Sequence, residues 1–422
     1  MTERTRIVVT GLGAVTPFGV GMPLFWDGIV SGRSAIRETE DEYLRQWAPV
    51  IAQVVDFDPY LYLDKKQVQN TDRFTQMGIV AAMEALRDAG WPDVESLHAS
   101  YASDQIGISI GCAFGGVQTL EDGSARLSTG RSSRVGPRLV PKSIPNAAGA
   151  SIATQFDIHG PVLTYSTACA SSANSIGEAS YWLRLGEAEM VLAGGTECLF
   201  SPAILAGLRA AGALATEGPE DYGKWSRPFD KGRTGMIMGE GAAMLVLETL
   251  DHARARGARI YAELIGYGTS NDAYHETSPD PKGRGAHLAM QRALKSAGLQ
   301  AEDIDYINAH ATATPAGDLA ETAALRETFG AHLDKIPVSS IKGAVGHMLG
   351  TAGAIESIAC AQALYTNTLP PTLNCDDKEA GAPQDVVPNH SRSQHITRAL
   401  SNSFGFGGQN GVLIWQNADF ID

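Results

Sequence analysis

One cysteine of this chain has neighbours that suit a reactive thiol. Cys169 lies in the segment Leu163-Thr-Tyr-Ser-Thr-Ala-Cys-Ala-Ser-Ser172, where a β-prone run ends in small residues and a helical pattern continues to about Gly186. This order predicts a sharp strand-to-helix turn with the thiol at the positive end of a helix, which favours the thiolate. Most free cysteines are buried and inert, but the small neighbours here leave room for a substrate. We therefore expect Cys169 to take an acyl group as a thioester.

Two histidines lie in small-residue segments of the second half of the chain. His310 follows an apolar run, and His347 lies with Lys342 in Ser339-Ser-Ile-Lys-Gly-Ala-Val-Gly-His347. A single histidine near glycines is more often a structural group than a catalytic one. Two histidines at strand ends beside a nucleophile, however, can donate hydrogen bonds or carry protons. We interpret Cys169, His310 and His347 as one site.

A glycine-rich segment, Asn402–Asn410, is expected to turn between two strands. Glycine lets the backbone come close to a ligand, so N–H groups of this turn and of Cys169 can hold an oxyanion. The segment Gly11–Pro17 superficially suggests a dinucleotide loop. It lacks the third glycine, and Pro17 interrupts the helix that should follow, so we discount it.

These motifs lie on elements that recur in two halves of the chain. Alternating strands and helices predict α/β layers with a largely parallel sheet. We place the division at residues 1–255, which carry the cysteine, and 256–422, which carry both histidines. The expected equivalent segments are strands 6–12 and 259–270, helices 71–88 and 285–297, strands 106–111 and 304–309, strands 163–166 and 337–340, and strands 242–247 and 411–415.

Composition excludes several functional classes. The net charge of −14 over 422 residues argues against bulk attraction to nucleic acid or an anionic membrane. No apolar run is long enough to span a bilayer, and the N-terminus does not resemble a signal peptide. The five cysteines are scattered and form no C-x-x-C pair, which argues against a disulfide framework or a zinc site. We expect a cytoplasmic protein.

The motifs together resemble those of one enzyme family, the β-ketoacyl-acyl-carrier-protein synthases of the thiolase superfamily. The resemblance is closest to the synthase II type and runs over essentially the whole chain. The segments that carry it are Val8–Gly13, Thr167–Ser172, Gly194–Glu197, Arg227–Asp230, Gly239–Ala242, the His310 segment, the Lys342–His347 segment and the turn at Gly405.

The resemblance implies a five-layered αβαβα thiolase fold built from two duplicated halves. It also implies a dimer and a decarboxylative Claisen condensation in type II fatty-acid or polyketide synthesis. In that reaction Cys169 is acylated by an acyl carrier protein, and His310 and His347 stabilise the enolate formed from the malonyl carrier. No metal or cofactor is expected, because loss of carbon dioxide generates the nucleophile and the substrate brings its own phosphopantetheine.

The resemblance also assigns supporting roles. The N–H groups of Cys169 and Phe406 form the oxyanion hole, and Phe406 gates the site beside Gly405 and Phe404. Lys342 orders the site through a carboxylate, for which Glu356 and Glu321 are both candidates. Asp318, at the start of the helix after His310, is a further supporting residue.

Two groups of residues depart from the family pattern. Phe114 stands where the family often has a smaller aliphatic residue at the floor of the acyl pocket, near the dimer interface, so we expect a short or reshaped pocket. Gln69, Asn70 and Gly212 replace basic residues that usually meet the carrier protein. The remaining candidates for carrier binding are Lys65, Lys66, Arg134, Arg138 and Arg209.

These departures leave alternatives open. The chain suits a specialised polyketide or polyene pathway, in which it pairs with a chain-length factor as a heterodimer and not with a second copy of itself. Two readings of other classes are a non-catalytic subunit that keeps the cysteine and a Cys-His thioester hydrolase. The sequence does not determine the natural acyl chain.

Overall fold

Most strands of the computed structural model, which describes residues 5–130 and 135–420, join into one 11-stranded sheet with the order β11-β10-β14-β15-β9-β1-β8-β7-β5-β6, and β2 pairs with β1. Two separate two-stranded sheets pair β3 with β4 and β12 with β13. The strands are β1 Ile7–Thr16, β2 Gly19–Val20, β3 Arg37–Glu38, β4 Val50–Ile51, β5 Ile106–Gly111, β6 Val162–Tyr165, β7 Met190–Glu197, β8 Gly241–Thr249, β9 Ala262–Asn271, β10 Tyr306–Asn308, β11 Val338–Ser339, β12 Thr368–Leu369, β13 Arg392–Ser393, β14 Arg398–Gly405 and β15 Gln409–Asn417.

The strand order repeats in mirror image about the centre of the sheet. The first half runs β1-β8-β7-β5-β6 and the second β9-β15-β14-β10-β11, and the two halves meet where β1 pairs with β9 at Val8↔Glu263 and Val9↔Ala262. Each strand expected from the duplication therefore occupies the same place in its half. The two halves are related copies of one topology.

The prediction of a largely parallel sheet is wrong. Only the outer pairs are parallel, namely β5 with β6 and β7, and β10 with β11 and β14. The central strands β8 and β15 run antiparallel to both of their neighbours. Runs of Val, Ile and Leu show that a strand is covered on both faces, but they carry no information on its direction.

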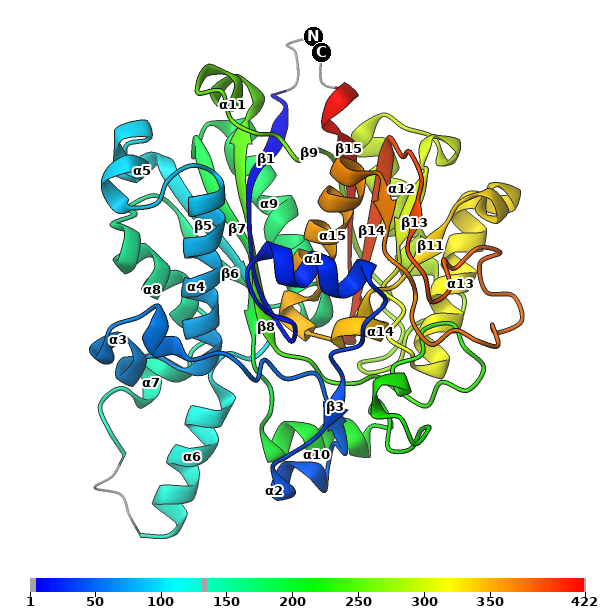
Figure 1. Ribbon diagram of the computed structural model, residues 1–422, viewed down its shortest axis with the longest axis horizontal. Coiled ribbons are helices and arrows are strands. Elements are labelled where there is room, and N and C mark those ends of the chain that lie inside the picture. Colours follow the sequence, from blue (N-terminus) through cyan, green and yellow to red (C-terminus); the bar gives the residue numbers. More distant parts are fainter. Residues whose placement is uncertain (1–4, 131–134, 421–422) are drawn as a thin grey trace.

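Two helices lie between the two halves of the sheet and others cover the outside (Figure 1). The central layer holds α9 and α15, the helices α4 and α8 cover the first half, and α12 and α13 cover the second, which gives the five layers expected from the resemblance. The helices are α1 Met22–Val30, α2 Glu42–Arg45, α3 Lys65–Asn70, α4 Arg73–Asp88, α5 Val94–Ser100, α6 Val117–Ser128, α7 Leu139–Ser143, α8 Ala147–Phe156, α9 Ser171–Leu185, α10 Pro202–Ala210, α11 Leu250–Ala255, α12 Arg284–Ala297, α13 Pro315–Phe329, α14 Lys342–Val345 and α15 Ala352–Thr366.

Helix ends follow local sequence signals. Helix α9 ends at Gly186 and α12 at Gly298, both in the left-handed conformation that glycine adopts without strain. The cap of α4 is Asp72, whose side chain accepts from Phe74 N–H. Within the part of the chain that the structure describes, no helix has both the length and the apolar character needed to cross a membrane.

Candidate active site

Cys169 sits on a single 3-10 turn, Ala168–Ala170, between β6 and α9. The preceding Ala168 has a φ of 50°, which is uncommon for a residue with a side chain and is typical of strained functional turns. The hydroxyl of Ser171 accepts from Thr167 N–H (2.9 Å) and donates to Ala168 C=O (2.6 Å), which holds the turn in place. The thiol is 4% exposed.

The turn is expected to favour the thiolate of Cys169, but in the resting site burial outweighs this effect. Burial raises the pKa of the Cys169 thiol to about 12. Lys342 and the N–H groups of Phe406 and Cys169 act in the opposite direction, but they do not offset the cost of burying a negative charge. At neutral pH the sulfur therefore holds its proton, and a base must remove it during acyl transfer.

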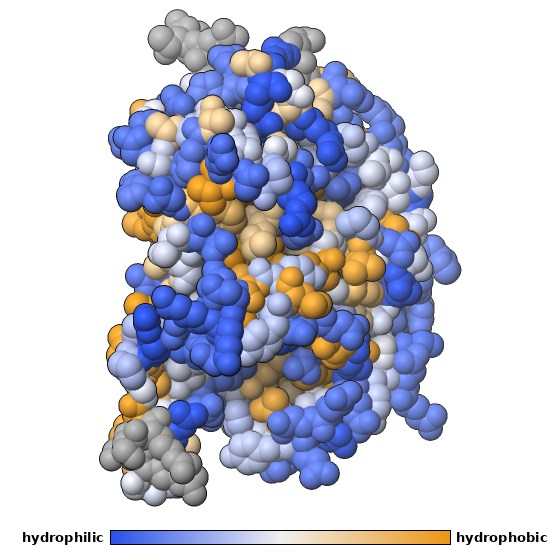
Figure 2. All heavy atoms as spheres, turned by 60° about the vertical axis from the view of Figure 1, so that its left-hand side comes forward, coloured by the Kyte–Doolittle hydropathy of each residue, from blue (hydrophilic) through white to orange (hydrophobic). Residues whose placement is uncertain are grey.

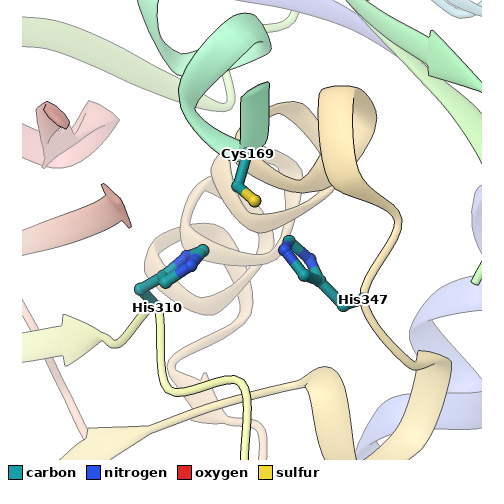
Figure 3. A group of neighbouring side chains, drawn as sticks. All are labelled: Cys169, His310 and His347. Carbon is teal, nitrogen blue, oxygen red and sulfur yellow. The ribbon is translucent and has the colours of Figure 1, made fainter. Parts of the chain in front are cut away.

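The two histidines face the sulfur from the second half of the chain (Figure 3). His310 follows β10, and its N–H donates to Glu321 at 2.9 Å. His347 follows α14, and its N–H donates to Ile237 C=O at 2.7 Å. The rings are nearly perpendicular, with centroids 5.3 Å apart. One nitrogen of each ring and the Cys169 sulfur lie within 4.8 Å of one another, so the structure brings the three predicted residues together.

Both imidazoles are neutral in this environment. Burial lowers the pKa of His310 well below its ordinary value, and Lys342 and His347 lower it further. Burial and Lys342 do the same to the pKa of His347. Nδ1 of His310 and both ring nitrogens of His347 have no hydrogen-bond partner among the described residues. Buried polar atoms are normally paired, so these nitrogens are free to contact a substrate or to accept the thiol proton.

Of the two candidate carboxylates, Glu356 is the one that pairs with Lys342. Its ammonium group forms a buried ion pair and hydrogen bond with Glu356 on α15. Burial raises the pKa of Glu356 to about 7, and Lys342 acts against this rise. The Lys342 charge lowers the pKa of both histidines and of Cys169, so the pair sets the electrostatics of the site.

Glu321 and Asp318 hold the loop that carries His310. Glu321 accepts from the N–H groups of His310 (2.9 Å) and Ala311 (2.7 Å) and from the Asn402 amide (3.0 Å). Asp318 accepts from Ala313 N–H at 3.1 Å and does not reach the reacting atoms. Both carboxylates position backbone, and burial raises the pKa of each, to about 7 for Asp318.

The glycine-rich turn reaches the nucleophile from β14. The N–H of Phe406 points at the Cys169 sulfur. A Cβ on Gly405 would lie 2.6 Å from Thr167 C=O and 3.2 Å from Cys169 N, so no side chain fits there. Phe404 packs edge-on to His310, with ring centroids 5.8 Å apart. The turn therefore places an N–H donor and two aromatic rings beside the site.

A cavity of about 350 Å³ opens onto these residues. Its walls include Thr312 and Thr314, which belong to the His310 segment but had no predicted role, and Met236. The segment 272–280 also lines it. Sequence inspection missed Met236 and this segment because neither belongs to a motif and both reach the cavity only through folding.

The structure does not place Phe114 in the cavity. Its side chain is 48% exposed and is absent from the wall of this cavity. The physical reason is the turn after β5, where Glu197 accepts from the N–H groups of Ala113 (2.6 Å) and Phe114 (3.4 Å). This turn leaves the ring at the protein surface. The expected role of Phe114 at the floor of an acyl pocket near the dimer interface stays a prediction.

The predicted carrier-binding residues lie on separate elements. Lys65 and Lys66 are exposed on α3, and Arg138 is exposed at the start of α7. Arg209 is exposed on α10, whose following residues line the cavity, and it donates to Gln46 C=O. Arg134 lies outside the described residues.

Comparison with known proteins matches two family models, described as the Beta-ketoacyl synthase N-terminal domain over residues 4–253 and C-terminal domain over residues 261–376. The chain is 40% identical over 413 residues to the 3-oxoacyl-[acyl-carrier-protein] synthase 2 of Coxiella burnetii, with 98% of each chain covered.

Two solved structures are similar over nearly the whole chain. One is a type II polyketide acyl-carrier protein in complex with its ketosynthase bound to the hexaketide, with a TM-score of 0.90, 30% identity and coverage of 99% and 100%. The other is the ishigamide ketosynthase/chain length factor, with a TM-score of 0.90, 32% identity and coverage of 98% and 100%.

Proposed function

The chain belongs to the β-ketoacyl synthase family, and from this premise we propose that it condenses an acyl group held on Cys169 with a malonyl group delivered by an acyl carrier protein. The observation that carries the proposal is the meeting of a buried thiol with two neutral, unpartnered imidazoles at one cavity. This set suits an acyltransferase that both forms a thioester and stabilises an enolate.

Acyl transfer begins with a proton transfer. A neutral imidazole takes the Cys169 proton while the sulfur attacks the carbonyl of the incoming thioester. The N–H groups of Cys169 and Phe406 then stabilise the oxyanion of the tetrahedral intermediate. The C–S bond to pantetheine breaks, and the departing thiolate regains the proton from the imidazolium.

Condensation uses the same groups in different roles. The malonyl thioester loses carbon dioxide, and the electrons of the broken C–C bond remain on the thioester as an enolate. The enolate oxygen accepts hydrogen bonds from His310 and His347. The enolate carbon attacks the acyl-Cys169 carbonyl, the C–S bond to Cys169 breaks, and the released thiolate takes a proton from the solvent to restore the resting thiol. Two donors that are already in place, in a site from which water is largely excluded, give stronger stabilisation than the same groups would in water.

No metal or organic cofactor enters this scheme. Loss of carbon dioxide generates the carbon nucleophile, and the phosphopantetheine arm arrives with the carrier protein. Thr312 and Thr314 line the cavity through which this arm would pass. All five cysteines are free thiols, which suits work in the reducing cytoplasm.

A second chain is part of the proposal. Strand β6 is an edge of the sheet, and unpaired edge strands favour pairing with another chain. Figure 2 shows apolar side chains gathered on the side of the molecule that is on the left in Figure 1, and such patches mark interaction surfaces. Exposed apolar residues on β6, on α6, on α7 or directly after it, and on α9 are Leu163, Leu120, Leu127, Val140, Ile144, Tyr181 and Leu185.

The partner is either an identical chain or a chain-length factor. The similarity to the ishigamide ketosynthase/chain length factor and to a type II polyketide ketosynthase favours the second candidate function, a ketosynthase of a specialised polyketide pathway. The likeness to a 3-oxoacyl synthase 2 supports fatty-acid elongation. The complete site argues against a non-catalytic subunit, and the burial of Cys169 argues against a hydrolase that needs open access for water.

Acyl loading tests the function directly. The protein, purified without a partner, is incubated with carrier proteins bearing acyl chains from acetyl to palmitoyl, and intact mass spectrometry reports the adducts; Cys169→Ala is the control. Loading of long saturated chains supports fatty-acid elongation. Loading of short chains alone, or only after a chain-length factor is added, supports the polyketide role, and no loading under either condition contradicts both.

A further inference from the structure

The three residues that face one another in Figure 3 are also a ligand set for a metal ion. Cys169, His310 and His347 each offer one donor atom, and the three atoms lie within 4.8 Å of one another. They come from three separate segments, and all three are buried. We propose that this triad binds a soft divalent cation, Zn²⁺ above all, and that the bound ion inhibits the protein by occupying the place of the acyl thioester.

The donor types select the ion. One sulfur and two imidazole nitrogens are the ligands that zinc prefers, whereas Mg²⁺ and Ca²⁺ require oxygen. Zinc binds sulfur at about 2.3 Å and imidazole nitrogen at about 2.0–2.1 Å, so tetrahedral neighbours lie roughly 3.4–3.6 Å apart. Because the observed donor atoms all lie within 4.8 Å of one another, they need to approach by at most about 1.4 Å to reach this geometry.

Ring nitrogens of both histidines are available to coordinate an ion. Nδ1 of His310 and both nitrogens of His347 lack a hydrogen-bond partner in the described part of the chain. Binding an ion would therefore break no existing hydrogen bond of these atoms. The three protein ligands leave a fourth position toward the cavity, the arrangement of open zinc sites.

The nearby positive charge does not prevent cation binding. The ammonium group of Lys342 lies in a buried ion pair with Glu356, and this carboxylate offsets part of the positive charge that the triad experiences. The second carboxylate oxygen of Glu356 has no hydrogen-bond partner among the described residues. The chain as a whole carries a charge of −14, which favours approach of a cation.

Binding has a defined chemical balance. The thiol of Cys169 forms an S–Zn bond and releases one proton to the buffer, and no electron is transferred. The same electron pair would otherwise attack an acyl thioester or an alkylating reagent. Zinc is thus an inhibitor here and is separate from the condensation chemistry, which needs no metal.

Protection of Cys169 from alkylation is the first test, and it needs no variant and no acyl substrate. The purified protein is treated with iodoacetamide, with and without Zn²⁺, and peptide mass spectrometry follows the Cys169 adduct. At a zinc concentration about ten times the dissociation constant, alkylation should slow roughly tenfold. Mg²⁺ at the same concentration should have no effect. An unchanged rate with Zn²⁺ contradicts the proposal.

Cobalt supplies a readout that identifies the ligands. Co²⁺ in the wild-type site should give a thiolate-to-cobalt charge-transfer band that is absent in Cys169→Ser and weakened in His310→Ala. The matched controls are Cys375→Ser and His287→Ala, which change a cysteine and a histidine outside the triad and should keep the band. A band that survives Cys169→Ser assigns the metal elsewhere and overturns the proposal. Because neither assay uses an acyl substrate, failure of the condensation activity would leave this result standing.

Discussion

The two halves of the sheet share a strand order but contribute different chemistry. In the first half β6 leads through the turn Ala168–Ala170 into α9, and in the second β11 is followed by the turn Leu349–Thr351 and α15. Ala168 and Leu349 begin these turns with φ values of 50° and 43°. The middle residue is Cys169 in one turn and Gly350 in the other. The duplication keeps the strained turn, while only one copy holds a nucleophile.

The turns after β5 and β10 show the same division. A buried glutamate accepts N–H groups from each turn: Glu197 from Ala113 and Phe114, and Glu321 from His310 and Ala311. The first turn presents no catalytic side chain, whereas the second presents His310. The first half therefore contributes the sulfur of the site and the second half contributes both imidazoles, and the proposed reaction takes place where the two halves meet.

The largest effect is expected from replacing Cys169, which the first half of the sheet contributes. Cys169→Ala removes the nucleophile, so covalent acyl loading should fall to background. Intact mass spectrometry after incubation with an acyl carrier thioester measures it, and Cys375→Ser is the control. Persistent loading of Cys169→Ala would mean that the nucleophile is misassigned.

A smaller but still large effect is expected from replacing His310 or His347, which the second half contributes. His310→Ala or His347→Ala should slow release of carbon dioxide from a malonyl carrier by about 10²-fold or more, the size typical of losing a positioned donor. His287→Ala, on α12, should leave the rate unchanged. Equal rates in all three variants would remove the histidines from the mechanism.

The pH dependence of alkylation sharpens the account of the resting thiol. Because burial raises the pKa of Cys169 to about 12, the thiolate fraction is small at neutral pH and grows as pH rises toward that pKa. The alkylation rate should therefore increase by roughly tenfold per unit from about pH 7 to pH 10, without a plateau. Rates measured with iodoacetamide check this, and a plateau near neutral pH would show that the resting residue is a thiolate.

The smallest effect is expected on stability, from a substitution in the turn Leu349–Thr351. A Cβ on Gly350 would lie 2.4 Å from Glu197 Oε2 and 2.8 Å from Ala113 N. Gly350→Ala should therefore lower the free energy of unfolding by about 1–3 kcal/mol. The control is Gly207→Ala on α10, where nothing lies within 4 Å of the added Cβ; denaturant titration compares the two, and equal stability would show that Gly350 is replaceable.

Features that depend on neighbouring residues could be predicted from the sequence, whereas features that depend on contacts between distant segments could not. Small-residue turns and their neighbours identified Cys169, His310 and His347, because each lies within a motif that is continuous in the chain. Strand direction, the choice of Glu356 as partner of Lys342, and the exposure of Phe114 depend on contacts between distant segments. The protonation of Cys169 could not be predicted either, because a helix terminus is visible in a sequence and the burial of its thiol is not.

Decarboxylation without a nucleophile tests the central claim most directly. Carbon dioxide release from a malonyl carrier is measured for Cys169→Ala and for the double variant Cys169→Ala/His347→Ala. If the second half performs decarboxylation by itself, the single variant should release carbon dioxide and the double variant should be slower by about 10²-fold. The division of chemistry between the two halves would be contradicted if Cys169→Ala released no carbon dioxide. It would also be contradicted if the double variant released carbon dioxide as fast as Cys169→Ala.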